Sequence, residues 1–375
     1  MAKTIVGVGD AKAIKRFSAF LAVDVGRKSY FNRKFMGVGE EAQTPIQTLP
    51  HLERDSGDQI SYDLVMQLKM RPIQGDATLR GKEEDLKFYT DSLYIDQLRG
   101  GVNTGGKMSR KRTIHDMRAI ARVRQSEWWA RLFDETLFQY LSGARGVNSD
   151  FIEDTSFTGY ATNAFVAPDA LHILYGGDAT SKATLDAADK ISLSVIDKAL
   201  ARAEVMGGGT SGIPSIQPCE IDGEPHFVLV MHPWQEYDLR TNTSTGQWLD
   251  IQKAAAGAEG KANPIFKGGL GLYNNVVLHK HKAVIQFSDY GAASPAVVKA
   301  GRALFLGRQA GVVAFGSPGT GLRFDWNEEL EDRGNQVVIT TSSIFGVKKS
   351  AFTIDGTSRD FGVIAIDTAC ADPTA

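Results

Sequence analysis

Alternation of apolar and polar residues marks the segment 57–70, GDQISYDLVMQLKM. Its apolar positions share one face of an extended chain and are Ile60, Tyr62, Leu64, Met66, Leu68 and Met70. A period of two predicts a half-buried strand. A second strand is predicted over 86–98, so that the two form a long hairpin with a polar tip, and a phase change between Phe88 and Leu93 predicts a bulge or strong twist. An isolated hairpin is marginally stable, so its apolar face requires a surface in the same subunit or in another.

The segment after the hairpin has the periodicity of a helix. Apolar residues recur every three or four positions from 113 to 141, and Gly143 supplies a stop. At ~1.5 Å per residue this predicts a helix roughly 40 Å long. The glycine-rich segment 100–109, GGVNTGGKMS, precedes it as a predicted joint, and a second amphipathic helix is predicted over 189–206.

The remaining segments mix strands, loops and one short helix. Strands are predicted over 226–232, 275–287, 336–347 and 361–367, with an apolar segment over 297–316 and a helix after Pro233. Residues 145–180 are irregular, and residues 1–56 show no sustained period, which predicts an extended arm. This order is neither a regular βαβ array nor a repeat, and it indicates an α+β protein.

Composition places the chain among folded proteins without a disulfide framework. Of its 375 residues 42% are hydrophobic and 23% charged, which excludes wholesale disorder. Cys219 and Cys370 are its two cysteines, too few for a disulfide scaffold, and favour a reducing compartment. No apolar run reaches the ~18 residues of a membrane span, and no signal peptide is evident, so we expect synthesis in a cytoplasm and no membrane partner.

Charge is balanced overall but segregated along the chain. A formal charge of −2 combines +6 over residues 1–35, +6 over 107–124 and about −14 elsewhere. The first segment includes Lys12, Lys15, Arg16, Arg27 and Lys28, and the second includes Lys107, Arg110, Lys111, Arg112, Arg118 and Arg122. Such a basic patch suits a polyanion or the acidic surface of a neighbouring subunit, although an exposed helix face has the same composition.

A dense acidic cluster follows near the C-terminal third. It comprises Asp325, Glu328, Glu329, Glu331 and Asp332. Its spacing indicates a loop, either a solvated face or the partner of a basic patch, and not a tuned acid and base pair.

The sequence matches known catalytic and ligand-binding motifs only weakly. In GSPGTGLR, 316–323, Leu322 and Arg323 stand where a phosphate-binding loop needs Lys and Ser or Thr. The imidazoles of His226, His232, His279 and His281 lie near two predicted strands and could form a metal site, although no carboxylate or cysteine stands at ligand spacing. We therefore expect no enzyme, no catalytic residue and no cofactor, with a metal-dependent enzyme using these histidines as the alternative.

The co-linear order of segments resembles the major capsid proteins of tailed bacteriophages. The resemblance rests on the alternating strand, the charged tip GDATLRGKEEDL, the run FYTDSLYIDQLRGGVNTGGKMSRKR and the helix ending LFDETLFQYLSG. It continues in ALFLGRQAGVVAFG, FDWNEELEDRGNQVVITTSSIFGVKKSAF and DFGVIAIDT. These matches cover 57–143 and 297–367, while 145–295 resembles the family in element order alone.

This resemblance implies the lambdoid capsid-shell fold. Its parts are an N-terminal arm over 1–56, an extended hairpin called the E-loop over 57–100, a peripheral domain with a spine helix over 101–144 and 322–350, and an axial domain over 145–321 and 351–375. It also implies that one face of the E-loop contacts a neighbouring copy, through Ile60, Tyr62, Leu64, Met66, Leu68, Phe88 and Tyr94. The glycines Gly100, Gly101, Gly105 and Gly106 are then expected to flex when a precursor shell expands.

The implied function is self-assembly into the icosahedral head shell around the double-stranded DNA of a tailed phage or prophage. Hexamers and pentamers of this chain, non-specifically bound DNA, and scaffolding, portal and decoration proteins are the implied partners. The implied location is the virion, after synthesis in the bacterial cytoplasm. An encapsulin-like shell and a dedicated nucleic-acid-binding protein are alternatives. Near-neutral net charge favours self-association, because many copies pack without net repulsion.

Overall fold

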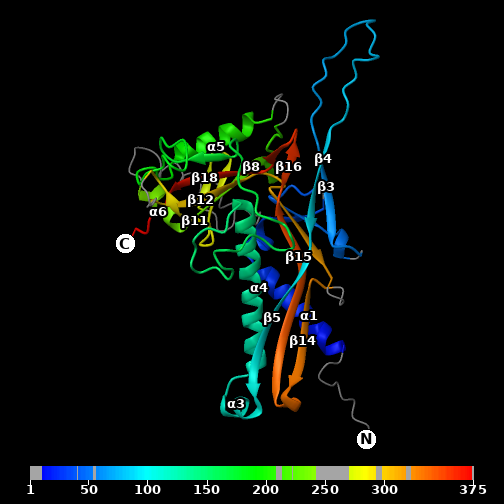
Figure 1. Ribbon diagram of the computed structural model, residues 1–375, viewed down its shortest axis with the longest axis vertical. Helices are drawn as coiled ribbons and strands as arrows, with labels where there is room; N and C mark the ends of the chain where they lie inside the picture. The colour runs from blue at the N-terminus through cyan, green and yellow to red at the C-terminus, as the bar shows by residue number, and fades with distance from the viewer. Residues whose placement is uncertain are drawn as a thin grey trace.

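The computed structural model describes residues 11–39, 41–53, 56–207, 213–221, 223–241, 270–292, 298–317 and 322–373, with side chains from Phe17 onward except that of Ile221. A long helix runs beside a long sheet, a second sheet lies across the upper end of the helix, and a hairpin projects beyond both (Figure 1). The molecule is therefore elongated, with projections outside its core.

The long helix is α4, Met117–Ser142, which confirms the helix predicted over 113–141. The Asp116 carboxylate caps it by accepting the N–H groups of Arg118 and Ala119. It ends at Gly143, whose φ is 69°, and a Cβ there would lie 2.1 Å from the carbonyl oxygen of Val166. Every residue from Trp129 to Ser142 is buried except Arg131. This half of the helix forms the centre of the core.

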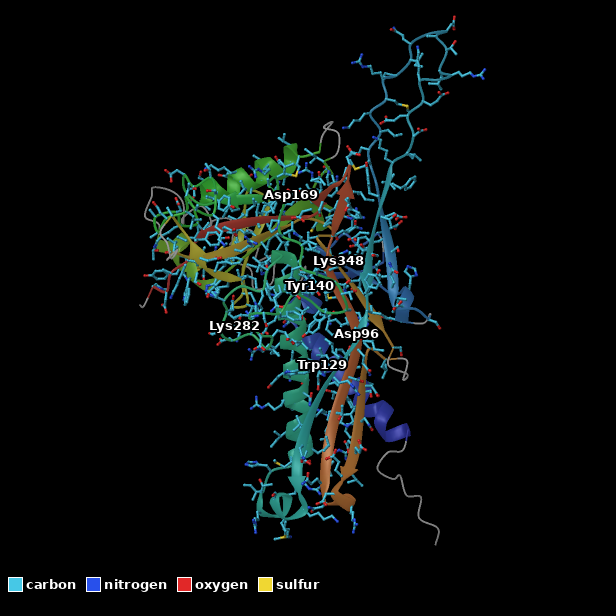
Figure 2. All side chains as sticks on the ribbon, viewed as in Figure 1. Asp96, Trp129, Tyr140, Asp169, Lys282 and Lys348 are labelled. Carbon is cyan, nitrogen blue, oxygen red and sulfur yellow. The ribbon has the colours of Figure 1, made fainter. Side chains whose placement is uncertain are left out.

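A six-stranded sheet covers one side of α4. Its longest strand, β15, has β5 on one edge and β14 followed by β13 on the other, and β2 and β1 extend the sheet beyond β13 in parallel. The bounds are β1 Met36–Val38, β2 Ile46–Leu49, β5 Asp96–Gly106, β13 Gly311–Gly316, β14 Phe324–Glu331 and β15 Gln336–Lys349. The indole N–H of Trp129 donates to Thr341 Oγ1 on β15 at 2.8 Å, which fixes the helix against this sheet (Figure 2).

The eight-stranded sheet covers the C-terminal end of α4. Its order is β6 (Ile173–Tyr175), β18 (Val363–Ala369), β12 (Val298–Leu306), β8 (Glu224–Met231), β10 (Val276–Lys280) and β9 (Gly271–Tyr273), with β11 (Gln286–Tyr290) beside β12 and β7 (Cys219–Ile221) beside β8. Along β8, Val228 and Val230 face the core around α4, while Leu229 packs toward α5 (Leu193–Val205). Both faces of β8 are covered, which explains its continuous apolar run. Helix α6, Pro233–Thr241, follows β8 as predicted.

The predicted E-loop hairpin is shorter than the alternation suggests. Strands β3 (Gln59–Val65) and β4 (Phe88–Tyr94) pair antiparallel, and residues 66–87 extend beyond them without helix or strand. The strand predicted over 86–98 is divided at Ile95 into β4 and β5, which belong to different sheets. The bulge predicted between Phe88 and Leu93 is not found, because β4 pairs with β3 in continuous register from Phe88 to Tyr94. A second hairpin, β16 (Ala351–Ile354) and β17 (Thr357–Asp360), lies beside β4.

The prediction of an extended arm is wrong for residues 11–34. They form α1, Ala11–Lys28, and α2, Tyr30–Lys34, before β1 begins. Phe17, Leu21 and Val25 recur at four-residue intervals and pack into the core that contains α4. Frequent basic residues and Gly26 hid this helical period in the sequence.

Two further expectations are corrected by the structure. The acidic cluster expected in a loop lies in β14 and in the short helix η2, Asp332–Gly334. The strand expected over 275–287 is two strands, β10 and β11, joined by a turn. The apolar segment 297–316 spans β12 and β13, so that β13, inside the range expected for the axial domain, joins the sheet of β15. Other short helices are η1, His51–Glu53, and α3, Lys107–Arg112.

The glycine-rich joint is also a strand. Gly100 and Gly101 lie opposite Thr341 and Thr340 in the β5–β15 ladder. A Cβ on Gly100 would stand 2.8 Å from the ring of Trp128, so glycine here allows the helix to approach the strand. Part of the glycine turn at 316–323, residues 318–321, lies outside the described residues.

Replacing Gly100 by Ala should therefore lower the free energy of unfolding by about 1–3 kcal/mol, the usual cost of overpacking a well-filled site. Gly101→Ala is the matched control: its Cβ would lie 3.6 Å from Thr340 Oγ1, an ordinary contact, and its effect should stay within about 0.5 kcal/mol. Urea unfolding of dissociated subunits, followed by tryptophan fluorescence, measures both. Equal midpoints for the two variants would contradict the packing role.

Candidate inter-subunit surfaces

The base of the E-loop hairpin packs on its own subunit. Leu93 is fully buried, and Ile60 and Tyr62 contact a cluster that includes Leu49 and Val312. The Tyr62 hydroxyl donates to Asp91 at 2.7 Å. The pKa of Tyr62 is raised, mainly by burial and to a lesser extent by the negative charge of Asp91. Ile60 and Tyr62, predicted to face a neighbour, are thus engaged within the subunit.

Two polar contacts hold the same base. Lys348 of β15 donates to Asp91 Oδ1 at 2.5 Å and to the Ser92 carbonyl oxygen at 3.0 Å. The backbone N–H and carbonyl of Tyr94 are both bound by the Asn163 amide. The hairpin therefore leaves the body of the subunit from a fixed origin.

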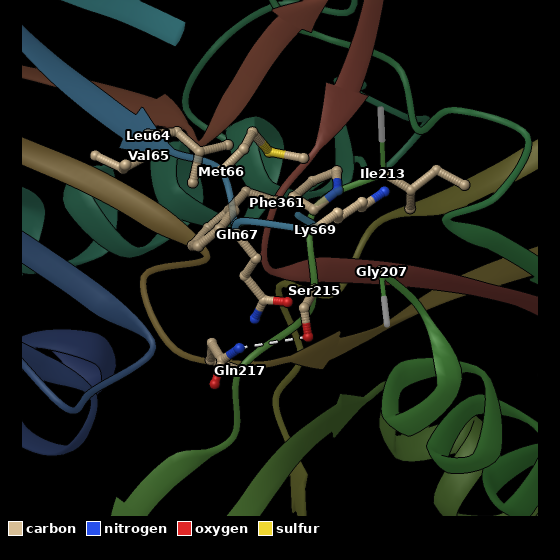
Figure 3. Close-up of a pocket in the computed structure, with 11 residues that line it drawn as sticks. Leu64, Val65, Met66, Gln67, Lys69, Gly207, Ile213, Ser215, Gln217 and Phe361 are labelled. Atoms are coloured by element: carbon tan, nitrogen blue, oxygen red, sulfur yellow. Dashed lines mark hydrogen bonds between the residues drawn. The ribbon is translucent and has the colours of Figure 1, made fainter. Parts of the chain in front are cut away.

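Beyond this origin the apolar side chains are exposed. Leu64 and Met66 still line a small cavity of about 150 Å³ with Ile213 and Phe361 (Figure 3). Farther along, six large apolar side chains are about half exposed, and they are Val65, Leu68, Met70, Leu79, Leu86 and Phe88. We call these six side chains the distal E-loop face. Contact of Leu64, Met66, Leu68, Phe88 and Tyr94 with a neighbour stays a prediction.

The predicted basic patch divides into two parts. Arg118 Nε donates to Glu328 Oε1 at 2.6 Å and its guanidinium lies 4.6 Å from the Phe17 ring, while Arg122 Nε lies 3.9 Å from Asp24 Oδ2. These arginines join α1, α4 and β14 of one subunit. Arg110 likewise donates to the Asn335 carbonyl oxygen at 3.1 Å.

The second part of the patch is exposed at the foot of the subunit, which we define as α3, the end of β14 from Glu329 onward and the turn between β14 and β15 (Figure 1). Lys107, Lys111 and Arg112 lie here on α3. Of the acidic cluster, Glu329, Glu331 and Asp332 are exposed beside them, whereas Glu328 and Asp325 contact residues of their own chain. The foot therefore carries both signs of charge.

Among the predicted arm residues, Lys28 is bound within the subunit and Arg27 is exposed. Lys28 Nζ donates to Ser126 Oγ at 2.7 Å and to the Val123 carbonyl oxygen at 3.3 Å. The side chains of Lys12, Lys15 and Arg16 lie outside the described part of the chain.

A buried carboxylate that sequence reasoning missed anchors the arm. Asp134, in the buried half of α4, accepts hydrogen bonds from Ser29 Oγ at 2.7 Å, Tyr30 N at 2.8 Å and Phe31 N at 3.2 Å. It thereby caps α2 from another element. Burial raises its pKa from 3.8 to about 7, although the three donors oppose the shift. An acidic residue within an apolar helical stretch was the available signal.

The four histidines do not converge on a metal site. His226 and His232 lie six positions apart along and just after β8, about 20 Å in an extended strand. His279 packs against Phe35 and His281 stacks on Phe138 at 5.0 Å between ring centroids. Burial lowers the pKa of both His232 and His281 to about 4. Within the described residues, no three His, Cys, Asp or Glu side chains are placed to hold a metal ion.

Comparison with known proteins supports the architecture. Residues 5–372 match a family described as phage capsid protein. The major capsid protein of Pseudomonas phage KPP25 is 27% identical over 356 residues, covering 88% of this chain and 89% of that protein. The capsid of Ralstonia phage GP4 is 50% identical over 99% of both chains, with a TM-score of 0.84. The capsid of cyanophage Pam1, 20% identical over 92% of this chain and 93% of that one, shares the fold with a TM-score of 0.69.

A spine helix between two sheets, with an arm and a projecting hairpin, is thus the fold of tailed-phage capsid proteins. The chain belongs to the phage capsid protein family and functions as the major capsid protein of a phage. The predicted fold class and capsid function are confirmed, and the metal-enzyme and encapsulin alternatives are not supported. Across the described residues, no helix is both long and apolar enough to span a membrane.

The proton equilibrium of Asp134 predicts a pH dependence. The pKa of Asp134 is about 7 in the folded state and the ordinary value is 3.8, so as the pH falls the folded state is protonated at a higher pH than the unfolded state. The contribution of Asp134 to the free energy of unfolding should therefore grow as the pH falls from about 8 to about 5. Unfolding of the wild type and Asp134→Asn across this range should show that difference, and parallel curves would contradict it. Asp150→Asn, at an exposed carboxylate, controls for the loss of one charge.

The exposed charges of the foot predict a selective effect on assembly. Reversal of Lys111 and Arg112 to Glu should leave subunit stability within about 0.5 kcal/mol of the wild type, yet reduce particle yield. Arg110 is kept, because it binds Asn335 within the subunit. Lys198→Glu, at an exposed position on the outer face of α5, is the control. Normal yield of the double variant, measured by sedimentation, would show that these charges are merely solvated.

Proposed function

We propose that this protein self-assembles, through hexamers and pentamers, into the icosahedral head shell that encloses the double-stranded DNA of a tailed phage. The observation that carries the proposal is the distal E-loop face, six large apolar side chains on a segment that projects beyond the core. Several large apolar side chains exposed on one projecting segment indicate an interaction site. A second copy of the chain is the partner, as expected for a shell.

The contacts of such a shell are individually modest. An E-loop laid on a neighbouring copy spreads its apolar side chains over a long, narrow surface, and the sum over many copies closes the particle. The rigid origin at Asp91, Lys348 and Asn163 supports this role, because it gives the projecting segment one direction.

Exposed charges can set the register between neighbouring subunits and can contact DNA. The foot presents Lys107, Lys111 and Arg112 beside Glu329 and Glu331, so basic side chains of one foot can pair with acidic side chains of a neighbouring foot. Exposed basic side chains also suit non-specific contact with phosphates of packaged DNA, which needs no base recognition.

The remaining parts of the proposal follow from a structural role. The chain acts without catalysis, is made in the host cytoplasm and ends in the virion. The division into arm, E-loop, peripheral domain and axial domain, over the ranges expected above, belongs to the same proposal. Scaffolding, portal and decoration proteins are the further partners.

Negative-stain microscopy of the expressed protein tests the proposal. Wild-type protein should form capsomers or closed shells, whereas Leu86→Asp with Phe88→Asp should leave soluble, folded subunits that do not assemble. Val205→Asp is the matched control, because Val205 is 79% exposed on α5 while Leu86 and Phe88 are 57% and 58% exposed. A clean monomer of wild type under all conditions, or normal shells from the double variant, would overturn it. Particles containing an enzyme and no DNA would favour an encapsulin-like role.

A further inference from the structure

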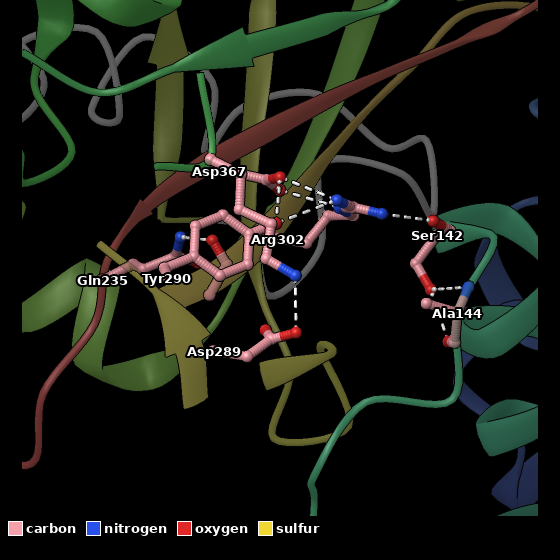
Figure 4. Close-up of polar contacts among 9 residues, drawn as sticks. Ser142, Ala144, Gln235, Asp289, Tyr290, Arg302 and Asp367 are labelled. Atoms are coloured by element: carbon pink, nitrogen blue, oxygen red, sulfur yellow. Dashed lines mark hydrogen bonds and ion pairs between the residues drawn. The ribbon is translucent and has the colours of Figure 1, made fainter. Parts of the chain in front are cut away.

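One buried guanidinium joins the end of the spine helix to the eight-stranded sheet (Figure 4). Arg302 on β12 lies opposite Asp367 on β18. Its Nε and Nη2 donate to the two carboxylate oxygens of Asp367, each at 2.7 Å. Its Nη1 donates to the carbonyl oxygen of Ser142, the last residue of α4, at 2.8 Å. A single side chain therefore binds two strands and the helix end.

The surroundings hold this side chain in one position. The Tyr290 hydroxyl on β11 donates to Asp367 Oδ2 at 2.6 Å and accepts from Arg302 Nη2 at 3.1 Å. The ring of Phe287 lies 4.7 Å from the guanidinium carbon. Burial opposes the charge of Arg302, but the attraction of Asp367 outweighs it and raises the pKa of Arg302.

The chain that leaves α4 is fixed at the same place. Gly143 turns with positive φ against Val166, and Val147 N then donates to the Gln286 carbonyl oxygen of β11 at 2.9 Å. The helix end is consequently held on both sides of its last turn. Rotation of α4 relative to the sheet would break the bond from Arg302 to Ser142.

A second buried ion pair in the same subunit provides a contrast. Lys349 and Asp360 are equally buried and 2.7 Å apart, but they join β15 to β17 rather than to α4. Buried pairs can often be replaced by apolar residues without loss of stability, so stability alone does not require either. What Lys cannot reproduce at position 302 is the planar fork that binds carboxylate and helix end together.

We propose that Arg302 is a positioning residue that sets the angle between the spine helix and the eight-stranded sheet, and through this angle the curvature and size of the shell. The inference rests on the proposed self-assembly. Every copy in a closed shell would have the same angle, so a change in this angle would be repeated in each subunit around the shell.

The test compares particle diameters of the wild type, Arg302→Lys, and a control with Lys349→Met and Asp360→Leu, by electron microscopy. Arg302→Lys retains a positive charge opposite Asp367 but lacks the planar fork of the guanidinium. It should still assemble, but its particles should differ in diameter from those of the wild type or vary more widely in diameter. The control should keep the wild-type diameter even where its melting temperature falls, because a purely structural defect lowers stability and yield without altering size. Wild-type diameter for Arg302→Lys, or the same size change in the control, would overturn the inference.

If Arg302→Lys is insoluble, Tyr290→Phe decides the matter. This variant lacks the hydroxyl that is hydrogen-bonded to both Arg302 and Asp367 and leaves the ion pair itself intact. The distribution of particle diameters should therefore become broader. An unchanged distribution for Tyr290→Phe would overturn the inference. Absence of any particle from wild-type protein would instead contradict the proposed function.

Discussion

Burial of the second half of α4 is the constraint on which the rest of the structure depends. From Trp129 to Ser142 this helix exposes Arg131 alone, so it must be enclosed by other elements. The six-stranded sheet covers one side, the arm helices pack alongside, and the eight-stranded sheet covers the C-terminal end. Segments from the two ends of the chain therefore meet around one helix.

Polar groups inside this core determine how its parts are oriented. Apolar packing tolerates small displacements, but a buried polar group without a partner is costly, so each buried hydrogen bond selects one arrangement. Trp129 binds β15, Asp134 binds the start of α2, and Arg302 binds the end of α4 to the eight-stranded sheet. These three contacts lie at the middle and the end of α4.

The surface divides into parts that serve the subunit and parts left for other molecules. Arg118, Arg122 and Lys28 are basic residues of the predicted patches, yet they bind their own arm or spine. The distal E-loop face and the foot retain exposed apolar and charged side chains far from the core. The exposed side chains that take no part in the subunit core are therefore found at its projecting ends.

Local apolar patterns by themselves determined α4, α5, β8, β15 and the first E-loop strand, β3, because the apolar spacing or the apolar run matches the geometry and burial of each element. The resemblance of segment order then indicated the capsid family. Tertiary structure alone decided that residues 11–28 form a helix and that the glycine-rich segment 100–106 forms a strand, since their partners α4 and β15 are distant in sequence. It also decided which charges pair internally and that β12 and β13 enter different sheets. A sequence pattern shows which face of a segment is apolar, but the element that covers that face is set by how the whole chain packs.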